Sequence, residues 1–400
     1  MGLPATREKR KKVVPTLQGI LQAHFAAFQS KHKLPKRIRD AAGAIMSCRT
    51  AAMGGHVERC PEGHAERVWY NSCKHRSCPK CGHLPTERWI EKQKARLLAC
   101  GHHHVIFTVP PELHALWRYN RERMMDVLFH CVRDTLFVLL GDERYGGLVP
   151  GLLCSYHSWG RDQGYHPHLH CLVTAGGRGK AGAWVPAKKA NLLPYLVVRD
   201  LYRGKMIAAV RGALHSGELV LPPDLPEFRL ENTLNRLGRA PWNVEIRERY
   251  PHGEGVLIYL ARYIRGGPIA DSRIVSFDSS SVVFKYLDHR DNTMKEMLLS
   301  PDDFLLRVLQ HVPPPRKKMV RHYGLYAEHN LEMLNASRAA LGQRRVEPRE
   351  FLKWETFWAK TEKEMPNLCP VCGRALVPGP RLRRWSTHDP GIKRPDEKAA

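Results

Sequence analysis

Between residues 100 and 290, short runs of the chain either alternate hydrophobic and polar positions or gather β-branched and aromatic residues. Such runs predict strands, because successive side chains of a strand point to opposite faces. The second and third runs are joined by only "RDQGY", which predicts an antiparallel hairpin, and a second hairpin is expected across "DSS". The expected strands are 104–110, 151–160, 166–177, 242–249, 272–277 and 281–288.

Longer segments repeat hydrophobic residues with the period of a helix. Thr86 is placed to cap one of them, and Gly266 with Gly267 is placed to end another. The expected helices are 16–30, 86–100, 112–142 (one helix or two), 195–217, 255–264 and 301–312, with further helical segments to about 365. This mixture predicts an α+β protein of two or three domains.

One expected strand begins with three histidines at alternate positions, His166, His168 and His170. Alternate residues of a strand share a face, so the imidazoles point one way while Leu169 and Cys171 pack on the other side. Neutral imidazole is a common ligand of divalent metals, and two ligands from one strand leave coordination positions open for catalysis. Surface histidines are the simpler alternative, but three in register before an apolar run favour a metal site.

Tyr259 and Tyr263 lie four residues apart in the expected helix 255–264. Positions i and i+4 share a helix face, so both phenols point the same way. Two core aromatics would be the commoner explanation of this pair taken alone. Its combination with a histidine-bearing strand favours chemistry, and the adjacent Arg262 could meet a phosphate.

Charge indicates the kind of partner. Lys and Arg number 64 against 39 Asp and Glu, which gives a net charge of +25 and an isoelectric point near 9.8. Because the basic residues are clustered, nucleic acid explains the excess better than solubility alone. The sequence has no apolar run of membrane-spanning length and no apolar signal core, so neither membrane insertion nor secretion is expected. The basic clusters are 8–12, 31–39, 313–322 and 381–385.

Five of the 11 cysteines lie between residues 48 and 81. Without a secretion signal, this clustering favours metal binding over disulfides. Cys78 and Cys81 form a Cys-Pro-Lys-Cys knuckle of the kind that binds tetrahedral zinc. We expect one structural zinc ion with ligands drawn from Cys60, His64, Cys73, Cys78 and Cys81.

Other candidate ligands lie outside this set. Cys48 and His56 are in reserve, and a second ion is conceivable. Cys369 and Cys372 form another Cys-Pro-x-Cys pair, which is half of a site completed elsewhere or no site at all. The histidine run at 102–104 is expected to be structural or close to a phosphate, because consecutive strand residues alternate faces.

Together these motifs resemble those of a known family. The sequence His168-Leu169-His170, followed by apolar residues, is similar to the His-hydrophobic-His motif of HUH single-strand endonucleases, and the two tyrosines resemble the paired nucleophiles of their two-tyrosine members. The cysteine-rich front end also resembles that of the rolling-circle transposases of bacterial insertion sequences. So do FTVP (107–110), HSWGRDQGYHPHLHCLVTAGG (157–177), YLARYI (259–264) and RHYGLYA (321–327).

The resemblance covers roughly residues 45–330 and implies a fold and a reaction. The expected fold is an HUH-type antiparallel sheet of about five strands with helices on one face, the histidine strand central and the tyrosine helix against it. The histidines would hold Mg²⁺ or Mn²⁺ at the scissile phosphate, with His166 or a residue of another strand as third ligand. A tyrosine would attack the phosphorus and leave a 5′-phosphotyrosine and a free 3′-OH.

The resemblance also concerns the zinc module. Relatives often have Cys-x-x-Cys-Gly-His where this chain reads CPEGH at 60–64, so His64 is expected to replace a missing cysteine. The module is expected to grip DNA, with Trp69, Tyr70 and the basic residues 74–76 at bases and backbone.

We therefore expect a cytoplasmic, nucleoid-associated bacterial DNA transposase that acts on single-stranded DNA. No Walker motif is present, so a host helicase would have to unwind the DNA. The alternatives are a replication initiator or relaxase with the same chemistry, and a non-catalytic zinc-dependent DNA-binding regulator; the oligomeric state is left open. The expected divisions are a basic leader (1–47), a zinc-binding DNA-binding domain (48–99), the catalytic domain (100–290), a basic helical accessory region (291–365) and a Cys-Pro-x-Cys segment with a disordered tail (366–400).

Overall fold

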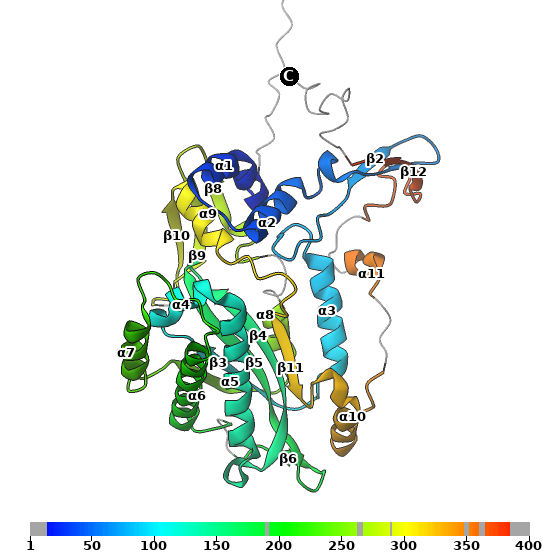
Figure 1. Cartoon of the computed structure of the whole chain (residues 1–400). Coiled ribbons are helices and arrows are strands. Elements are labelled where there is room, and N and C mark those ends of the chain that lie inside the picture. The colour runs from blue at the N-terminus through cyan, green and yellow to red at the C-terminus, as the bar shows by residue number, and fades with distance from the viewer. Residues whose placement is uncertain are drawn as a thin grey trace, which may run out of the picture.

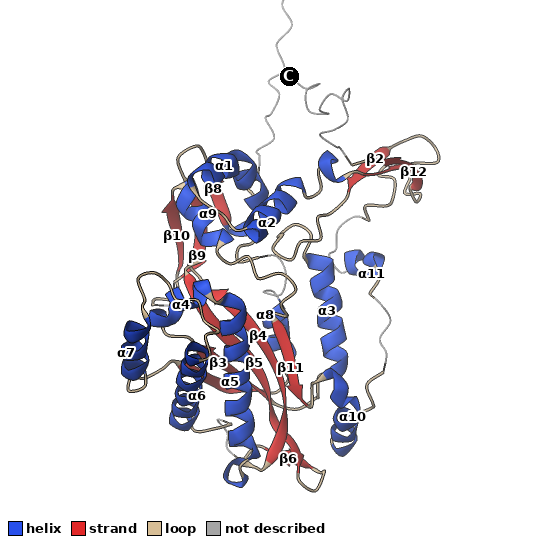
Figure 2. Ribbon diagram, viewed as in Figure 1, coloured by secondary structure: helices blue, strands red, loops and turns tan. Residues whose placement is uncertain are grey.

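The structure is a computed structural model that describes residues 14–188, 192–261, 267–288, 290–347, 352–359 and 365–384. Helices and antiparallel strands mix throughout these ranges, so the expected α+β class is confirmed (Figure 2). None of the helices in them is long and apolar enough to cross a membrane.

An antiparallel sheet occupies the lower half of the view in Figure 1. Its strands in spatial order are β11 (Val320–Gly324), β4 (Leu148–Trp159), β5 (Tyr165–Gly179), β3 (His102–Thr108) and β7 (Val244–Tyr250). A short strand, β6 (Trp184–Pro186), pairs with the end of β5. The histidine strand β5 is central, as expected, and β4 with β5 forms the first expected hairpin.

Helices cover both faces of this sheet. On one face α5 (Arg121–Gly141) and α6 (Tyr195–His215) share a core with every second residue of β5, such as Leu169. On the other face α8 (Glu254–Ala261) packs against Leu172. Because both faces are covered, β5 is buried along most of its length. The expectation of helices on one face only is therefore wrong, although the tyrosine helix does lie against the sheet.

Two expected helices are defined more closely by the structure. The segment 112–142, expected as one helix or two, is two helices, α4 (His114–Tyr119) and α5. The Asn120 backbone between them leaves the helical path, at ψ 37°, and its side-chain amide donates to the Val220 carbonyl at 2.7 Å. The helix expected to be capped by Thr86 begins earlier, as α3 (His83–Arg96). Thr86 therefore lies within the helix and does not cap it. Its hydroxyl donates to the carbonyl of Gly82, the residue that precedes the helix.

The N-terminal helices belong to a second core. In it, α1 (Leu17–Lys31) and α2 (Lys36–Ser47) pack with α9 (Pro301–Leu309) and a small antiparallel sheet. The order β10-β9-β8 of this sheet confirms the second expected hairpin, β8 with β9, whereas β10 was not expected. The core thus crosses the divisions expected from the sequence. Its strands are β8 (Ile274–Phe277), β9 (Val282–Leu287) and β10 (Met294–Leu299).

A third sheet joins the two ends of the chain. In it, β1 (Gly55–Arg59) lies between β2 (Glu66–Tyr70) and β12 (Val377–Leu382), antiparallel to both. In Figure 1 the red β12 lies in the same small sheet as the blue β2. Most of the expected disordered tail, from 385 onwards, lies outside the described residues.

Three further α-helices lie in the described part of the chain. They are α7 (Glu227–Leu237), α10 (Leu331–Ala340) and α11 (Trp354–Ala359). Helix α11 contacts α3, which runs along the side of the central sheet (Figure 1). Short 3₁₀ helices are Ala51–Met53, Pro111–Leu113, Glu143–Tyr145, Asp271–Arg273 and Glu328–Asn330.

Leu305 and Leu306 of α9 offer a matched test of the second core. Leu305 is fully buried in the core that contains α1 and α2, whereas Leu306 is 43% exposed. We expect Leu305→Ala to lower the free energy of unfolding by about 2–5 kcal/mol, and Leu306→Ala by less than about 1 kcal/mol. Urea denaturation measures both, and equal losses would contradict the packing of this helix.

Candidate active site and metal clusters

Three histidines from two neighbouring strands converge on one face of the central sheet. They are His157 of β4 and His168 and His170 of β5, and their nearest ring nitrogens all lie within 4.8 Å of one another. The Nε2 atoms of His168 and His170 are 3.0 Å apart. All three residues are buried, and the strand pairing sets His157 directly opposite His168.

Hydrogen bonds to the far side of two rings orient them. His168 Nδ1 donates to the backbone carbonyl of His166 at 2.6 Å, which leaves the Nε2 lone pair directed at the cluster. His104 of β3 lies 2.8 Å from His170, Nε2 to Nδ1. A His170 ring protonated on Nδ1 donates to His104 and directs its own Nε2 lone pair at the cluster. Such partners on the outer nitrogen are usual for histidines that bind metals.

Burial keeps the three imidazoles neutral. Loss of hydration lowers the pKa of His168 to about 3, and it lowers the pKa values of His157 and His170 well below the ordinary value. Neighbouring imidazoles add to the effect, because a charge on one ring disfavours a charge on the next. At neutral pH all three rings are therefore in the form that binds metal.

Tyr259 faces this cluster from α8. The centre of its ring lies 5.7 Å from that of His170 and 5.9 Å from that of His104. The tyrosine and the three histidines line one cavity of about 330 Å³, together with the basic side chains of Arg161, Arg247 and Arg273. The cavity thus combines a phenol, a set of neutral ligands and cationic groups suited to a phosphate. Tyr263 lies outside the described residues.

The third ligand was expected to be His166 or a residue of another strand, and the structure places a histidine of another strand beside His168 and His170. His166 lines the cavity but is not part of the cluster; its ring centre lies 5.1 Å from that of His168. The histidine of the other strand is His157 of β4, a candidate ligand that the sequence reasoning did not name. No direct signal in the sequence pointed to it, because the register of the hairpin shifts just after His157, and regular pairing continued back from the turn would not set it opposite His168. His104, within the run expected to be structural or close to a phosphate, supports His170.

The cysteines form two clusters, where one set of ligands was expected. Cys48, Cys73, Cys78 and Cys81 have sulfur atoms within 4.8 Å of one another, and Cys73 Sγ lies 3.7 Å from Cys81 Sγ. Backbone N–H groups of Cys73 and His75 donate to sulfurs of this cluster at 3.5 Å. Cys48, named from the sequence as an additional candidate ligand, therefore completes the group around the Cys-Pro-Lys-Cys knuckle.

Cys60 and His64 do not join that group. The expectation that they share one zinc ion with Cys73, Cys78 and Cys81 is therefore wrong for these two residues. They lie instead with Cys369 and Cys372, which the pairing of β1 with β12 brings close. The other reserve residue, His56, lies 3.6 Å from Glu58 and belongs to neither cluster.

Most of the chain is similar in sequence to known transposases. Residues 151–332 match a family model described as "Putative transposase", and residues 20–109 match one described as "Transposase zinc-binding domain". The chain is 31% identical over 374 residues to "Putative transposase y4qJ" of Sinorhizobium fredii, covering 90% of this chain and 93% of that protein. The chain belongs to this transposase family. It is also 30% identical over 355 residues to the transposase for insertion sequence element IS801 of Pseudomonas savastanoi pv. phaseolicola, covering 83% of this chain and 81% of that protein.

A solved structure is also similar to part of the transposase. It is the conjugative relaxase TrwC in complex with oriT DNA, at 12% identity over 40% of this chain and 68% of that chain. The TM-score of 0.23 is too low to establish a common fold.

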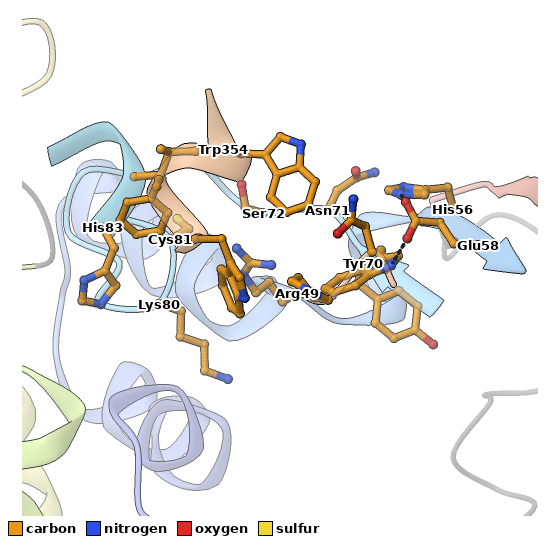
Figure 3. A pocket seen from close by; sticks show the side chains of 16 residues that line it. Arg49, His56, Glu58, Tyr70, Asn71, Ser72, Lys80, Cys81, His83 and Trp354 are labelled. Atoms are coloured by element: carbon orange, nitrogen blue, oxygen red, sulfur yellow. Dashed lines mark hydrogen bonds and ion pairs between the residues drawn. The ribbon is translucent and has the colours of Figure 1, made fainter. Parts of the chain in front are cut away.

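A second, larger cavity of the transposase, of about 640 Å³, lies beside the first cysteine cluster (Figure 3). Residues of the N-terminal module form one wall, and α11 with Pro366 and Asn367 forms the other. The Trp69 indole, which lines the cavity, donates to Glu58 at 2.8 Å and is held in place by that bond. Aromatic and basic side chains dominate the lining: Trp69, Tyr70, Trp354, Phe357, Trp358, Arg49 and Lys80.

Removing single histidines tests the make-up of the active-site cluster. His157→Ala is expected to weaken Mn²⁺ binding more than His104→Ala, which should cost about 10–100-fold as an outer partner. His166→Ala should have the smallest effect, because its ring lies outside the cluster. Calorimetric titration of each purified variant with Mn²⁺ gives the order, and a larger loss for His166→Ala than for His157→Ala would contradict it.

Proposed function

We propose that this transposase nicks and rejoins single-stranded DNA, with Tyr259 as a nucleophile beside a divalent cation held by His157, His168 and His170. One observation carries the proposal: a phenol from α8 and three neutral imidazoles from β4 and β5 line the same cavity. Membership of the transposase family supports the substrate class, DNA.

The donor set suits a divalent cation. Neighbouring ligands of an octahedral ion with bonds of about 2.1 Å are about 3 Å apart, and the Nε2 atoms of His168 and His170 are separated by 3.0 Å. Mg²⁺ and Mn²⁺ are both candidates. A set of three imidazole nitrogens favours Mn²⁺ over Mg²⁺, because Mg²⁺ is the harder ion and prefers oxygen ligands. A cation in this place would polarise a non-bridging oxygen of the scissile phosphate and fix its orientation.

Tyr259 would supply the attacking oxygen. Attack of its Oη on the phosphorus forms the phosphotyrosine bond as the bond to the 3′ oxygen of the preceding nucleotide breaks, which leaves the protein on the 5′ end. The phosphodiester energy is retained, so a free 3′-OH can reverse the step without ATP. Arg161, Arg247 and Arg273 line the same cavity and could hold the phosphate that the phenol attacks. Tyr263 remains the predicted second nucleophile, able to accept a second DNA end.

The larger cavity supports contact with unpaired bases. Bases stack on aromatic side chains regardless of sequence, and cationic groups hold the backbone beside them. Trp69 and Tyr70, predicted from the sequence to meet DNA, line the same cavity as Trp354 and Phe357. We propose that this cavity holds unpaired nucleotides of the transposon end, while a host helicase supplies the single strand.

A covalent adduct tests the reaction. With a 5′-labelled or 3′-labelled single-stranded oligonucleotide of the transposon end and Mn²⁺, we expect an adduct on the 3′-labelled fragment alone, which is the fragment with the new 5′ end. We expect it to weaken in Tyr259→Phe and to vanish when Tyr259→Phe and Tyr263→Phe are combined. Denaturing gels measure it, and Tyr119→Phe, at an exposed position of α4, is the matched control.

The alternatives give other outcomes. DNA binding without any adduct under any metal would support a zinc-dependent regulator. An adduct formed only on plasmid origin DNA, and not on transposon ends, would support a replication initiator or relaxase.

Trp354 tests the larger cavity separately. Trp354→Ala is expected to weaken binding of a single-stranded oligonucleotide by about 1–3 kcal/mol, since one stacked base is lost. Trp354→Phe should retain most of the affinity because a ring remains. Fluorescence anisotropy gives both values, with a blunt duplex as control. Equal losses for the duplex and the single strand would contradict a site for unpaired bases.

A further inference from the structure

Two turns about 300 residues apart in the chain meet at one end of the third sheet. Cys60 directly follows β1, and Cys369 lies a few residues before β12. The antiparallel pairing of the two strands, from Gly55 opposite Leu382 to Arg59 opposite Val377, brings these turns together. Three sulfur atoms and one imidazole nitrogen, from Cys60, His64, Cys369 and Cys372, lie within 4.8 Å of one another.

The spacing of these atoms is that of a tetrahedral zinc site. With Zn–S bonds of about 2.3 Å and Zn–N bonds of about 2.05 Å, tetrahedral geometry separates two sulfurs by about 3.8 Å and a sulfur from a nitrogen by about 3.6 Å. Cys60 Sγ lies 3.6 Å from Cys372 Sγ and 3.8 Å from His64 Nδ1. A disulfide needs about 2.05 Å, and all four cysteines of the first cluster and all three of this one are unbridged.

The backbone on each side is folded as a metal knuckle. After Cys369 the Val371 N–H donates to the Cys369 sulfur at 3.4 Å, and the chain turns back through Gly373, which has a φ of +70°. After Cys60 the chain turns through Gly63, with a φ of +75°, and its N–H donates to the Cys60 carbonyl at 3.0 Å. Both turns use glycine where other residues would be strained.

Apart from the pairing of β12 with β1, the described part of the C-terminal segment, residues 365–384, has a small buried core. The core at this end of the sheet consists of Cys60, Cys369 and Leu376 with Ala65 packed against them. An ion pair between Arg374 and Glu62 and a hydrogen bond from Arg67 to the Pro366 carbonyl are at the surface or half-buried. So small a core rarely stabilises a fold without a metal or a disulfide.

We propose that Cys60, His64, Cys369 and Cys372 bind a second zinc ion that fastens the C-terminal segment to the N-terminal module. Four protein ligands fill the tetrahedron, so the role is structural. The fastened segment includes Pro366 and Asn367, which form part of one wall of the larger cavity. Zinc at this site therefore fixes the shape of that cavity from the opposite end of the chain.

Counting zinc in the purified full chain tests the proposal. We expect two ions per chain in the wild type, and one in Cys60→Ser and in the double variant Cys369→Ser/Cys372→Ser. Cys100→Ser, outside both clusters, should keep two. Plasma mass spectrometry after dialysis gives the count. One ion in the wild type, or two in the double variant, would overturn the proposal.

His64 separates metal loss from misfolding, because its side chain is exposed and its removal leaves no cavity. His64→Ala should lose one zinc ion, while His64→Cys, which offers a thiolate in the same place, should keep two. Hydrogen exchange of the amides of β12 should speed up at least about tenfold in His64→Ala and not in His64→Cys, since metal binding is coupled to local folding. Unchanged exchange on loss of the ion would also overturn the proposed fastening. Neither readout depends on nicking, so the outcome is independent of the function proposed above.

Discussion

Between β4 and β5, His157 stands opposite His168, and this strand pairing decides which imidazoles can share one ion. Side chains of a strand alternate faces, so a slip of one residue would move the β5 histidines to the face now occupied by Leu169 and Cys171. The register is held because both faces of β5 are buried: one in the large core with α5 and α6, the other beneath α8. Packing of apolar residues on the first face thus positions the polar residues on the second.

The same burial sets the chemistry. A helix on the histidine face excludes water, which depresses the imidazole pKa values and keeps the rings ready to bind a cation. That helix also carries Tyr259, so one packing contact both desolvates the ligands and delivers the phenol. The neutral rings leave the positive charges of the cavity to Arg161, Arg247 and Arg273, where a phosphate would need them. Burial of the histidines and the position of Tyr259 are therefore not independent features of this site.

Local patterns in the sequence were enough to predict six of the strands, most of the helices, two of the three clustered histidines and the facing tyrosine. The six strands are β3, β4, β5, β7, β8 and β9. The period of two in β5 identifies His168 and His170 without reference to anything distant. What could not be predicted depends on pairing between remote segments. Cys60 meets Cys369 only because β12 pairs with β1, and no local periodicity encodes a contact across more than 300 residues. The helix on the second face of the sheet was missed because this packing is also a contact between separate segments. The hydrophobic pattern of a helix indicates that one side is buried, but not which face of a sheet buries it.

Remote contacts of this kind also connect the first cysteine cluster to the active site. Cys48 and Cys78 are buried in the second core with α1 and α2, so a metal ion there would stabilise that core as well as the knuckle. Ser77 of the knuckle packs its carbonyl against Gly267, at φ +74°, where an added Cβ would lie only 2.8 Å from that oxygen. Gly267 follows the tyrosine segment by a few residues, so the knuckle limits where the chain can go after α8. Loosening the cysteine cluster would release this restraint at Gly267. The cysteine-rich module thus contacts the chain shortly after the helix that carries Tyr259, in addition to being a candidate DNA-binding module.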